Sequence, residues 1–272
     1  MLKIFERAAA GGSGTLYRGP SPEGLTLSDF GRVAEIYDAT RSLPREEMDA
    51  LMAEMARRIP VRGSVLDVGV GTGRFALPLQ ERGLEVFGMD VSRGMMAKAR
   101  AKGVLRLLFA DVQRMPFRDG SFDAALLVHI LHLVGDWRAV VRESARVSRG
   151  TVVSVLEDAT GPDLRSEYRE LRGRMGHPLV RLEKGERALE ELARPIATVL
   201  VAESDRVVVA DDEIAHLRER GQSLTWDVPE DVHAGIIAAL RERHAGRTYR
   251  RRSTVRLAVW SAADLREPGQ GR

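Results

Sequence analysis

The stretch VLDVGVGTGRF, residues 65 to 75, decides the fold of this 272-residue chain. It begins as a hydrophobic strand with Asp67 near its end, and residues 75 to 82 can form a helix. Between them lie Gly69, Gly71 and Gly73. Glycine accepts positive φ angles and lets a backbone pass close to a ligand. The stretch therefore predicts a strand, a tight turn beside a ligand and a helix start.

Hydrophobic segments alternate with helical ones beyond this stretch. Further strands are expected at residues 84–89, 104–109, 122–129 and 151–156, with helical segments between most of them. Strands and helices in this rhythm favour a parallel sheet with right-handed crossovers and helices on both faces. The sequence therefore predicts an α/β protein with one substantial core.

The flanking regions add helices and less regular strands. Helical spacing of apolar residues predicts two helices within residues 30–59, before the first strand. The sequence of the second half predicts β-rich pieces at 196–202 and 206–210, helices at 212–220 and 229–244, and a last strand at 253–260.

Three acidic residues follow successive expected strands. Asp67, Asp90 and Asp111 lie at the ends where parallel strands of such sheets bind ligands. Asp90 lies close to the roughly 20-residue offset at which an acid accepts hydrogen bonds from a ribose. Each acid alone is more often a helix N-cap. Together with the glycine turn, they indicate nucleoside binding.

The glycine spacing bears on which nucleotide binds. A dinucleotide site is typified by G-x-G-x-x-G, in which the third glycine allows close helix packing. Arg74 occupies the position where that spacing requires the third glycine. The pattern therefore argues against a nicotinamide oxidoreductase, which stays the weakest alternative.

Composition excludes several classes of site. The chain has no cysteine, so it has no disulfides, thiolate metal sites or cysteine nucleophiles. Its formal net charge of +3 gives no strong case for a nucleic-acid partner. It contains no apolar run long enough for a membrane span and no secretory pattern, so we expect a cytoplasmic protein.

Three motifs carry a resemblance to a known family. VLDVGVGTGRF resembles the first motif of class I S-adenosylmethionine-dependent methyltransferases, and VFGMDVSRGMM resembles their acidic second motif. The segment FADVQRMPFRDGSFDAALLVHILHLVGDW is similar to the following region of the small-molecule branch, which includes the ubiquinone and menaquinone methyltransferases. The resemblance implies a Rossmann-like, seven-stranded, mostly parallel sheet with a helical cap and an antiparallel last strand.

The resemblance also implies a role for each matching residue in holding S-adenosyl-L-methionine. The glycine turn passes beside the methionine part, which Asp67 helps to orient, and Asp90 holds the ribose hydroxyls. The remaining expected cofactor contacts are Val91, Met95, Asp111 and Val112 around the adenine, His129 near the sulfonium, and Tyr37 of a YD motif closing over the cofactor.

Histidines near this edge are the candidates for proton transfer. His129 ends the fourth expected strand and is our candidate catalytic base, whereas we interpret His132 as a structural residue at a helix start. No third ligand accompanies them, so we expect no metal site. Methyl transfer itself needs alignment of the reacting atoms and shielding from water, and no metal is required.

Domain organisation is expected to follow the motifs. We assign residues 1–29 to a flexible N-terminal segment and 30–157 to the N-terminal helices and cofactor-binding core. Residues 158–194 are expected to form a helical lid or insertion, and 195–272 the C-terminal part of the core with substrate-side elements.

The motifs and their resemblance therefore predict S-adenosylmethionine-dependent methyl transfer to a small organic acceptor. Two alternatives stay open: a non-catalytic regulatory protein that binds the same cofactor, and an RNA methyltransferase. The RNA methyltransferase alternative rests on the arginine cluster at residues 247–252, in which Tyr249 is the only aromatic residue that could stack on a base. The oligomeric state is open.

Overall fold

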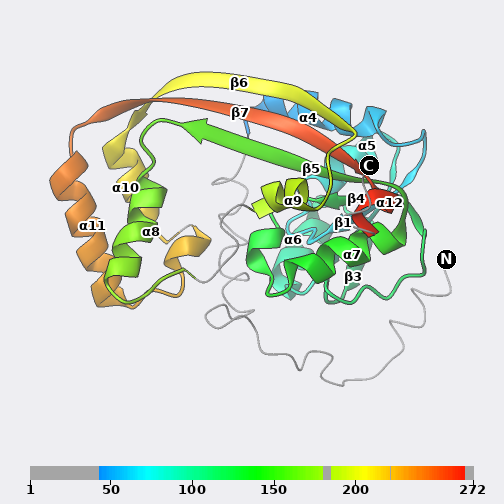
Figure 1. Cartoon of the computed structure of the whole chain (residues 1–272), viewed down its shortest axis with the longest axis horizontal. Coiled ribbons are helices and arrows are strands. Elements are labelled where there is room, and N and C mark those ends of the chain that lie inside the picture. Colours follow the sequence, from blue (N-terminus) through cyan, green and yellow to red (C-terminus); the bar gives the residue numbers. More distant parts are fainter. Residues whose placement is uncertain (1–42, 180–184, 221, 267–272) are drawn as a thin grey trace.

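The computed structural model describes residues 43–179, 185–220 and 222–266. Seven strands form one sheet in the order β3-β2-β1-β4-β5-β7-β6. Strands β1 to β5 pair in parallel, and β7 runs antiparallel to both of its neighbours. This is the class I methyltransferase arrangement of a Rossmann-like sheet, so the predicted fold is confirmed (Figure 1).

The strands of the parallel part lie close to their expected positions. They are β1 (Ser64–Val68), β2 (Glu85–Asp90), β3 (Arg106–Phe109), β4 (Phe122–Leu127) and β5 (Ser148–Thr160). The antiparallel part consists of β6 (Ala197–Val209) and β7 (Thr248–Ser261). Strand β5 is longer than expected, and the two β-rich pieces expected between 196 and 210 form one strand.

Helices cover both faces of the sheet. One face packs against α4 (Arg45–Arg57), α5 (Ala76–Glu81) and α6 (Arg93–Lys102). The other packs against α7 (Trp137–Val147), α9 (Leu189–Leu192) and α12 (Ala262–Arg266). Two short 3-10 turns, η1 (Leu131–Leu133) and η2 (Gly185–Ala188), lie beside each other at the second face. The first helix expected within residues 30–59 falls largely outside the described residues.

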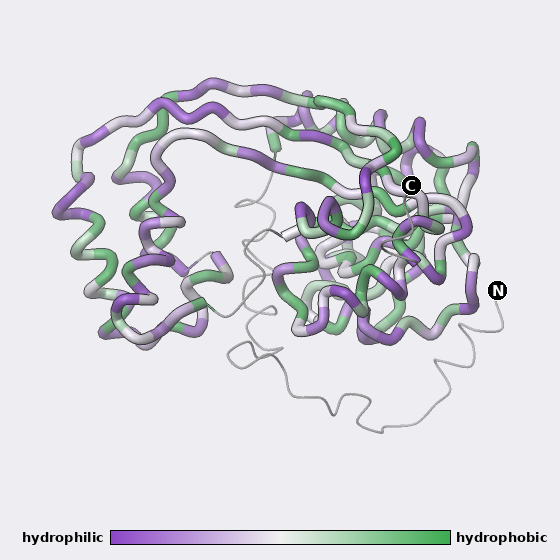
Figure 2. The backbone as a smooth tube through the Cα atoms, viewed as in Figure 1, coloured by the Kyte–Doolittle hydropathy of each residue, from purple (hydrophilic) through white to green (hydrophobic). Residues whose placement is uncertain are grey.

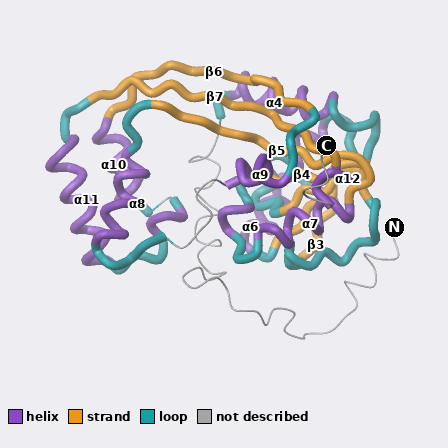
Figure 3. Tube along the Cα trace, in the orientation of Figure 1, coloured by secondary structure: helices purple, strands orange, loops and turns teal. Residues whose placement is uncertain are grey.

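Strands β5, β6 and β7 extend beyond the core as a three-stranded ribbon (Figure 3). The ribbon carries three helices at its far end: α8 (Leu164–Arg174), α10 (Ala210–Arg218) and α11 (Glu230–His244). A third 3-10 turn, η3 (Ser223–Thr225), joins α10 to α11. Because β5 runs from the core toward these distal helices, they lie on the side where the parallel strands end (Figure 1).

The distal helices α8, α10 and α11 have a hydrophobic core of their own. Leu164, Ile214, Ile236 and Leu240 are among its buried residues, and Figure 2 shows hydrophobic stretches in these helices as well as in the main sheet. The segment 158–194, expected to be a lid or insertion, supplies α8 to the distal helices and α9 to the main core.

Buried polar groups fix the packing of the distal helices. The Arg172 side chain is 2% exposed, and its guanidinium donates to both carboxylate oxygens of Asp227 at 3.1 Å. The Tyr168 hydroxyl lies 2.6 Å from Nδ1 of His233. Burial lowers the pKa of His233, because the charged imidazolium loses hydration there. These pairs join α8, α11 and the loop between α10 and α11 into one unit.

Candidate functional site

The turn after β1 needs its three glycines for two different physical reasons. Gly69, Gly71 and Gly73 all have φ angles between 53° and 77°. A Cβ on Gly69 would lie 2.6 Å from Cδ1 of Ile130, and one on Gly73 would lie 2.6 Å from Cγ2 of Val104. A Cβ on Gly71 would meet only the Gly69 carbonyl oxygen, at 3.9 Å. Gly69 and Gly73 thus permit packing, whereas Gly71 leaves open space beside the turn.

Asp90 connects this turn to the start of α6. Its Oδ2 accepts a hydrogen bond from the Gly71 amide at 2.8 Å, and its Oδ1 accepts one from Ser92 at 2.8 Å. A carboxylate offers about four acceptor positions. Asp90 can therefore hold the turn in place and still accept hydrogen bonds from two ribose hydroxyls.

Asp67 is a buried acid near the end of β1. Its side chain is nearly inaccessible, and its Oδ2 has no hydrogen-bond partner among the described residues. Burial, followed by the nearby charge of Asp90, raises the pKa of Asp67 to about 7. Buried acceptors are rarely left unsatisfied. A ligand ammonium placed here would satisfy this oxygen and lower the pKa of the acid, so the site fits the amino-acid end of S-adenosyl-L-methionine.

The loop after β3 holds Asp111 and Val112. Asp111 Oδ1 accepts a hydrogen bond from the Gln113 amide at 2.9 Å, and Val112 is buried in the core. The Gln113 side chain accepts one in turn from the Asp136 amide at 3.0 Å. On the neighbouring element, Met95 of α6 is almost fully buried.

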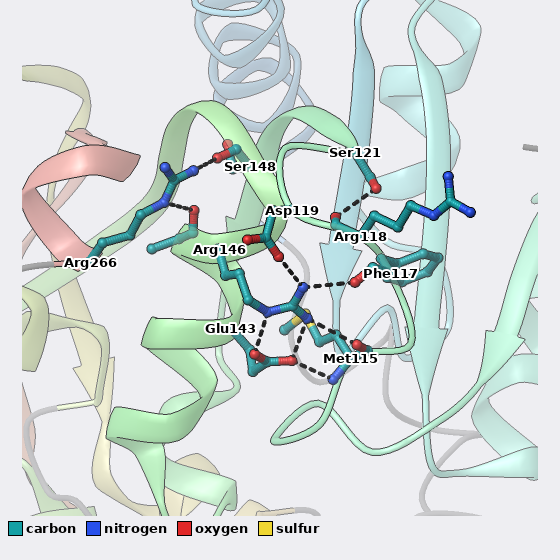
Figure 4. A network of polar contacts seen from close by, with 10 residues as sticks. Met115, Phe117, Arg118, Asp119, Ser121, Glu143, Arg146, Ser148 and Arg266 are labelled. Carbon is teal, nitrogen blue, oxygen red and sulfur yellow. Dashed lines mark hydrogen bonds and ion pairs between the residues drawn. The ribbon is translucent and has the colours of Figure 1, made fainter.

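Arg146 of α7 holds the rest of this loop against the core (Figure 4). Its guanidinium donates to the carbonyl oxygens of Phe117 and Met115 and to the carboxylate of Asp119, at 2.8 to 3.0 Å. Glu143 pairs with Arg146 and accepts a hydrogen bond from the Met115 amide. The pKa of Glu143 is lowered, mainly by its hydrogen bonds to Arg146. This network fixes the loop between β3 and β4.

His129 follows β4 with a φ of +56°, an uncommon angle for a residue with a Cβ. Its Nε2 lies 3.3 Å from Oε1 of Glu157, on the outgoing part of β5. Local strain of this kind is concentrated at functional sites. His132 lies in η1, next to Leu131, which is fully buried.

The sheet order brings the predicted residues to one edge. Strands β3, β2, β1 and β4 are neighbours, so their carboxyl ends lie side by side. The residues at or just after these ends are Asp111, Asp90 with Val91, Asp67 with the glycine turn, and His129. Tyr37 lies outside the described residues. Their roles in binding stay predictions.

Two residues near His129 had no signal in the sequence. Glu157 reads as a charged residue after an expected strand end, and Glu186 as one charge among many in a polar helical stretch. The structure places Glu157 beside His129. It buries Glu186 against the loop that follows His129.

The arginine cluster at residues 247–252 is largely paired. Its partners are carboxylates: Asp205 for Arg250, Glu213 for Arg251 and Glu203 for Arg252. Arg251 is also buried. Neighbouring carboxylates therefore offset the positive charge that these three arginines would present to a phosphate backbone. Trp226 donates its indole N–H to the Arg220 carbonyl, which anchors the loop between α10 and α11.

Within ranges 43–179, 185–220 and 222–266, no group of three potential ligands is arranged to hold a metal ion. In the same part of the chain, no helix has the length and apolar character needed to cross a bilayer.

Comparisons with known proteins agree with this geometry. A methyltransferase domain family matches residues 66–153. The demethylmenaquinone methyltransferase of Streptomyces avermitilis is 29% identical over 223 residues, which cover 79% of this chain and 92% of that enzyme. The malonyl-(acyl-carrier protein) O-methyltransferase of Salmonella typhimurium is 34% identical over 149 residues, which cover 53% of this chain and only 59% of that enzyme.

Solved structures show the same fold. The YcgJ protein from Bacillus subtilis superposes with a TM-score of 0.52 and 23% identity, covering 78% of this chain and 97% of that one. A methyltransferase-like structure from Bacillus halodurans gives a TM-score of 0.51 at 18% identity, covering 79% and 98%. The chain thus has the class I methyltransferase fold, and its residues 66–153 match the methyltransferase domain family.

Proposed function

We propose that this methyltransferase transfers the methyl group of S-adenosyl-L-methionine to a small organic acceptor at the carboxyl edge of its sheet. The observation that carries the proposal is Asp67, a buried acid with an unsatisfied oxygen beside a glycine turn. An ammonium in that position satisfies the oxygen. A nucleotide pyrophosphate would place negative charge beside a buried acid, which is unfavourable.

The cofactor contacts proposed among the described residues are supported by the surroundings of those residues. Asp90 keeps acceptor capacity for the ribose while holding Gly71. The adenine is assigned to Val91, Met95, Asp111 and Val112, which follow β2 and β3. When bound, the cofactor supplies a methyl group already activated by its sulfonium. The protein then has to orient the acceptor and exclude water.

His129 is proposed as the proton acceptor for the incoming nucleophile. A hydroxyl that attacks the methyl group loses a proton, and His129 lies after β4, next to the cofactor turn after β1. Glu157, 3.3 Å away, can stabilise the imidazolium that forms. An acceptor that is already ionised would not need this transfer.

The acceptor is proposed to be a small organic molecule with an ionisable oxygen. The relatives are named for a demethylated menaquinone and for a malonyl group on a carrier protein, and both names are compatible with a site open to an oxygen or carbon nucleophile. Paired arginines in the 247–252 cluster give no support for RNA. We keep a cytoplasmic location as a prediction.

A radiolabel assay tests the proposal. Protein and methyl-labelled S-adenosylmethionine are incubated with a panel of hydroquinones, phenols, carboxylic acids and structured RNA, for the wild type and His129→Ala. We expect label in one class of small molecule, lowered about 100-fold or more in the variant. Full turnover by His129→Ala would remove the proposed proton transfer. Cofactor binding without transfer to any acceptor would favour the regulatory alternative.

A further inference from the structure

Glu186 of η2 is a buried acid outside the predicted set of site residues. Its side chain is 6% exposed, in a part of the chain that the sequence gives as strongly charged. A buried carboxylate is costly unless it accepts hydrogen bonds. Its Oε1 accepts two, from the backbone amides of Ile130 at 2.6 Å and Leu131 at 3.1 Å.

The two amides belong to the loop that carries His129. Ile130 and Leu131 directly follow His129, whose φ of +56° needs support from its surroundings. The Ile130 side chain also covers Gly69 so closely that a Cβ there would meet its Cδ1 at 2.6 Å. One carboxylate thus holds a short loop that contacts the cofactor turn and presents the proposed proton acceptor.

The position of η2 in the chain gives this contact a further consequence. It lies between α8 of the distal helices and the edge strand β6. The residues after Glu186, Ala188 and Leu189, are fully buried in the main core. The polypeptide that joins the distal helices to the sheet is therefore anchored at the loop of His129.

We infer that Glu186 is a positioning residue of the methyl-transfer site. Its carboxylate fixes the backbone of residues 129–131, and through Ile130 it fixes the Gly69 side of the cofactor turn. The inference rests on the proposed cofactor site but is separate from the identity of the acceptor. It assigns no chemistry to Glu186, which acts through its neighbours.

Three substitutions and one control test the inference. Glu186→Ala removes both hydrogen bonds, and Glu186→Asp draws the carboxylate back by one methylene. Glu186→Gln keeps an oxygen that can accept both bonds. Glu190→Ala, at an exposed position on α9, is the matched control. Each variant is titrated with S-adenosylhomocysteine by calorimetry, and amide hydrogen exchange is followed at residues 129–131.

We expect Glu186→Ala and Glu186→Asp to exchange faster at the Ile130 and Leu131 amides. Their affinity for S-adenosylhomocysteine should fall about tenfold, because the turn next to the cofactor is displaced. Glu186→Gln and Glu190→Ala should stay within about twofold of the wild type. If Glu186→Ala does not fold, Glu186→Asp and Glu186→Gln still make the comparison.

Unchanged affinity in a folded Glu186→Ala or Glu186→Asp protein would overturn the inference and leave Glu186 as a packing support for the loop of residues 129–131, without effect on the cofactor turn. So would equal losses in Glu186→Gln and Glu186→Asp, because the first keeps the acceptor oxygen in place. Failure of the wild type to bind S-adenosylhomocysteine would instead count against the proposed cofactor site.

Discussion

Alanine substitutions at three glycines can distinguish two roles of the turn after β1. These roles are close packing at Gly73 and close approach of a ligand at Gly71. Gly73, Gly71 and Gly83 all have positive φ angles, of 77°, 53° and 85°. Each alanine therefore bears a conformational cost of about 1 kcal/mol. Gly83 lies after α5, and a Cβ there would meet nothing within 4 Å. Gly83→Ala is the control that reports the backbone cost alone.

Gly73→Ala adds a steric cost. The new Cβ would lie 2.6 Å from Val104 Cγ2 and 3.3 Å from Ala99 Cβ, in a buried cluster with little room to relax. Overpacking of this kind costs about 1–3 kcal/mol. We therefore expect Gly73→Ala to lower the free energy of unfolding by about 3 kcal/mol, against about 1 kcal/mol for Gly71→Ala and Gly83→Ala.

Urea unfolding and calorimetry together provide the assay. With a slope of about 2–3 kcal/mol per molar urea, Gly73→Ala should shift the midpoint by about 1 M and the other two by less than half of that. Gly71→Ala should lose most of its affinity for S-adenosylhomocysteine despite its small effect on stability. Equal stabilities for Gly73→Ala and Gly83→Ala, or wild-type affinity in Gly71→Ala, would refute this reasoning.

Further predictions concern buried charge. Because the pKa of Asp67 is about 7 in the folded protein against 3.8 normally, the ligand-free protein should lose stability as pH rises from about 4 to 7. Asp67→Asn should lack that loss and be more stable by about 2–4 kcal/mol at pH 8, measured by urea unfolding; a parallel pH dependence in both proteins would contradict this. Arg172→Ala leaves Asp227 without its buried partner and should destabilise the distal helices by about 3–5 kcal/mol. In Arg172→Ala, amide hydrogen exchange should be faster in α8 and α11, while the affinity for S-adenosylhomocysteine should be unchanged. Loss of binding would contradict this prediction, because it would show that the cofactor site depends on the distal helices.

The parallel part of the fold could be predicted because its signals are local. A hydrophobic strand, a glycine turn and a helix recur within a few residues, and Ser92 and Gly103 mark the two ends of α6. Asp67, Asp90 and Asp111 could be assigned to one edge because parallel strands place their carboxyl ends together.

The ribbon could not be predicted in full because its stabilising contacts are distant in sequence. Glu203, Ser204 and Asp205 read as a break between two β-rich pieces. In the structure they continue β6, opposite Thr254, Ser253 and Arg252 of β7. Similarly, β5 runs past Leu156 through charged residues because its backbone pairs with β7 as far as Thr160, opposite Arg252. Polar residues of this kind show no hydrophobic alternation, so the periodicity ends before the strand does.

Calorimetric titration of the ligand-free protein with S-adenosylmethionine and S-adenosylhomocysteine tests the central claim most directly. NADH serves as the comparison ligand and Asp90→Asn as the variant. We expect dissociation constants on the order of micromolar for the first two ligands, clear weakening in Asp90→Asn, and no binding of NADH. Folded protein, free of co-purified ligand, that binds neither S-adenosyl compound would contradict the account.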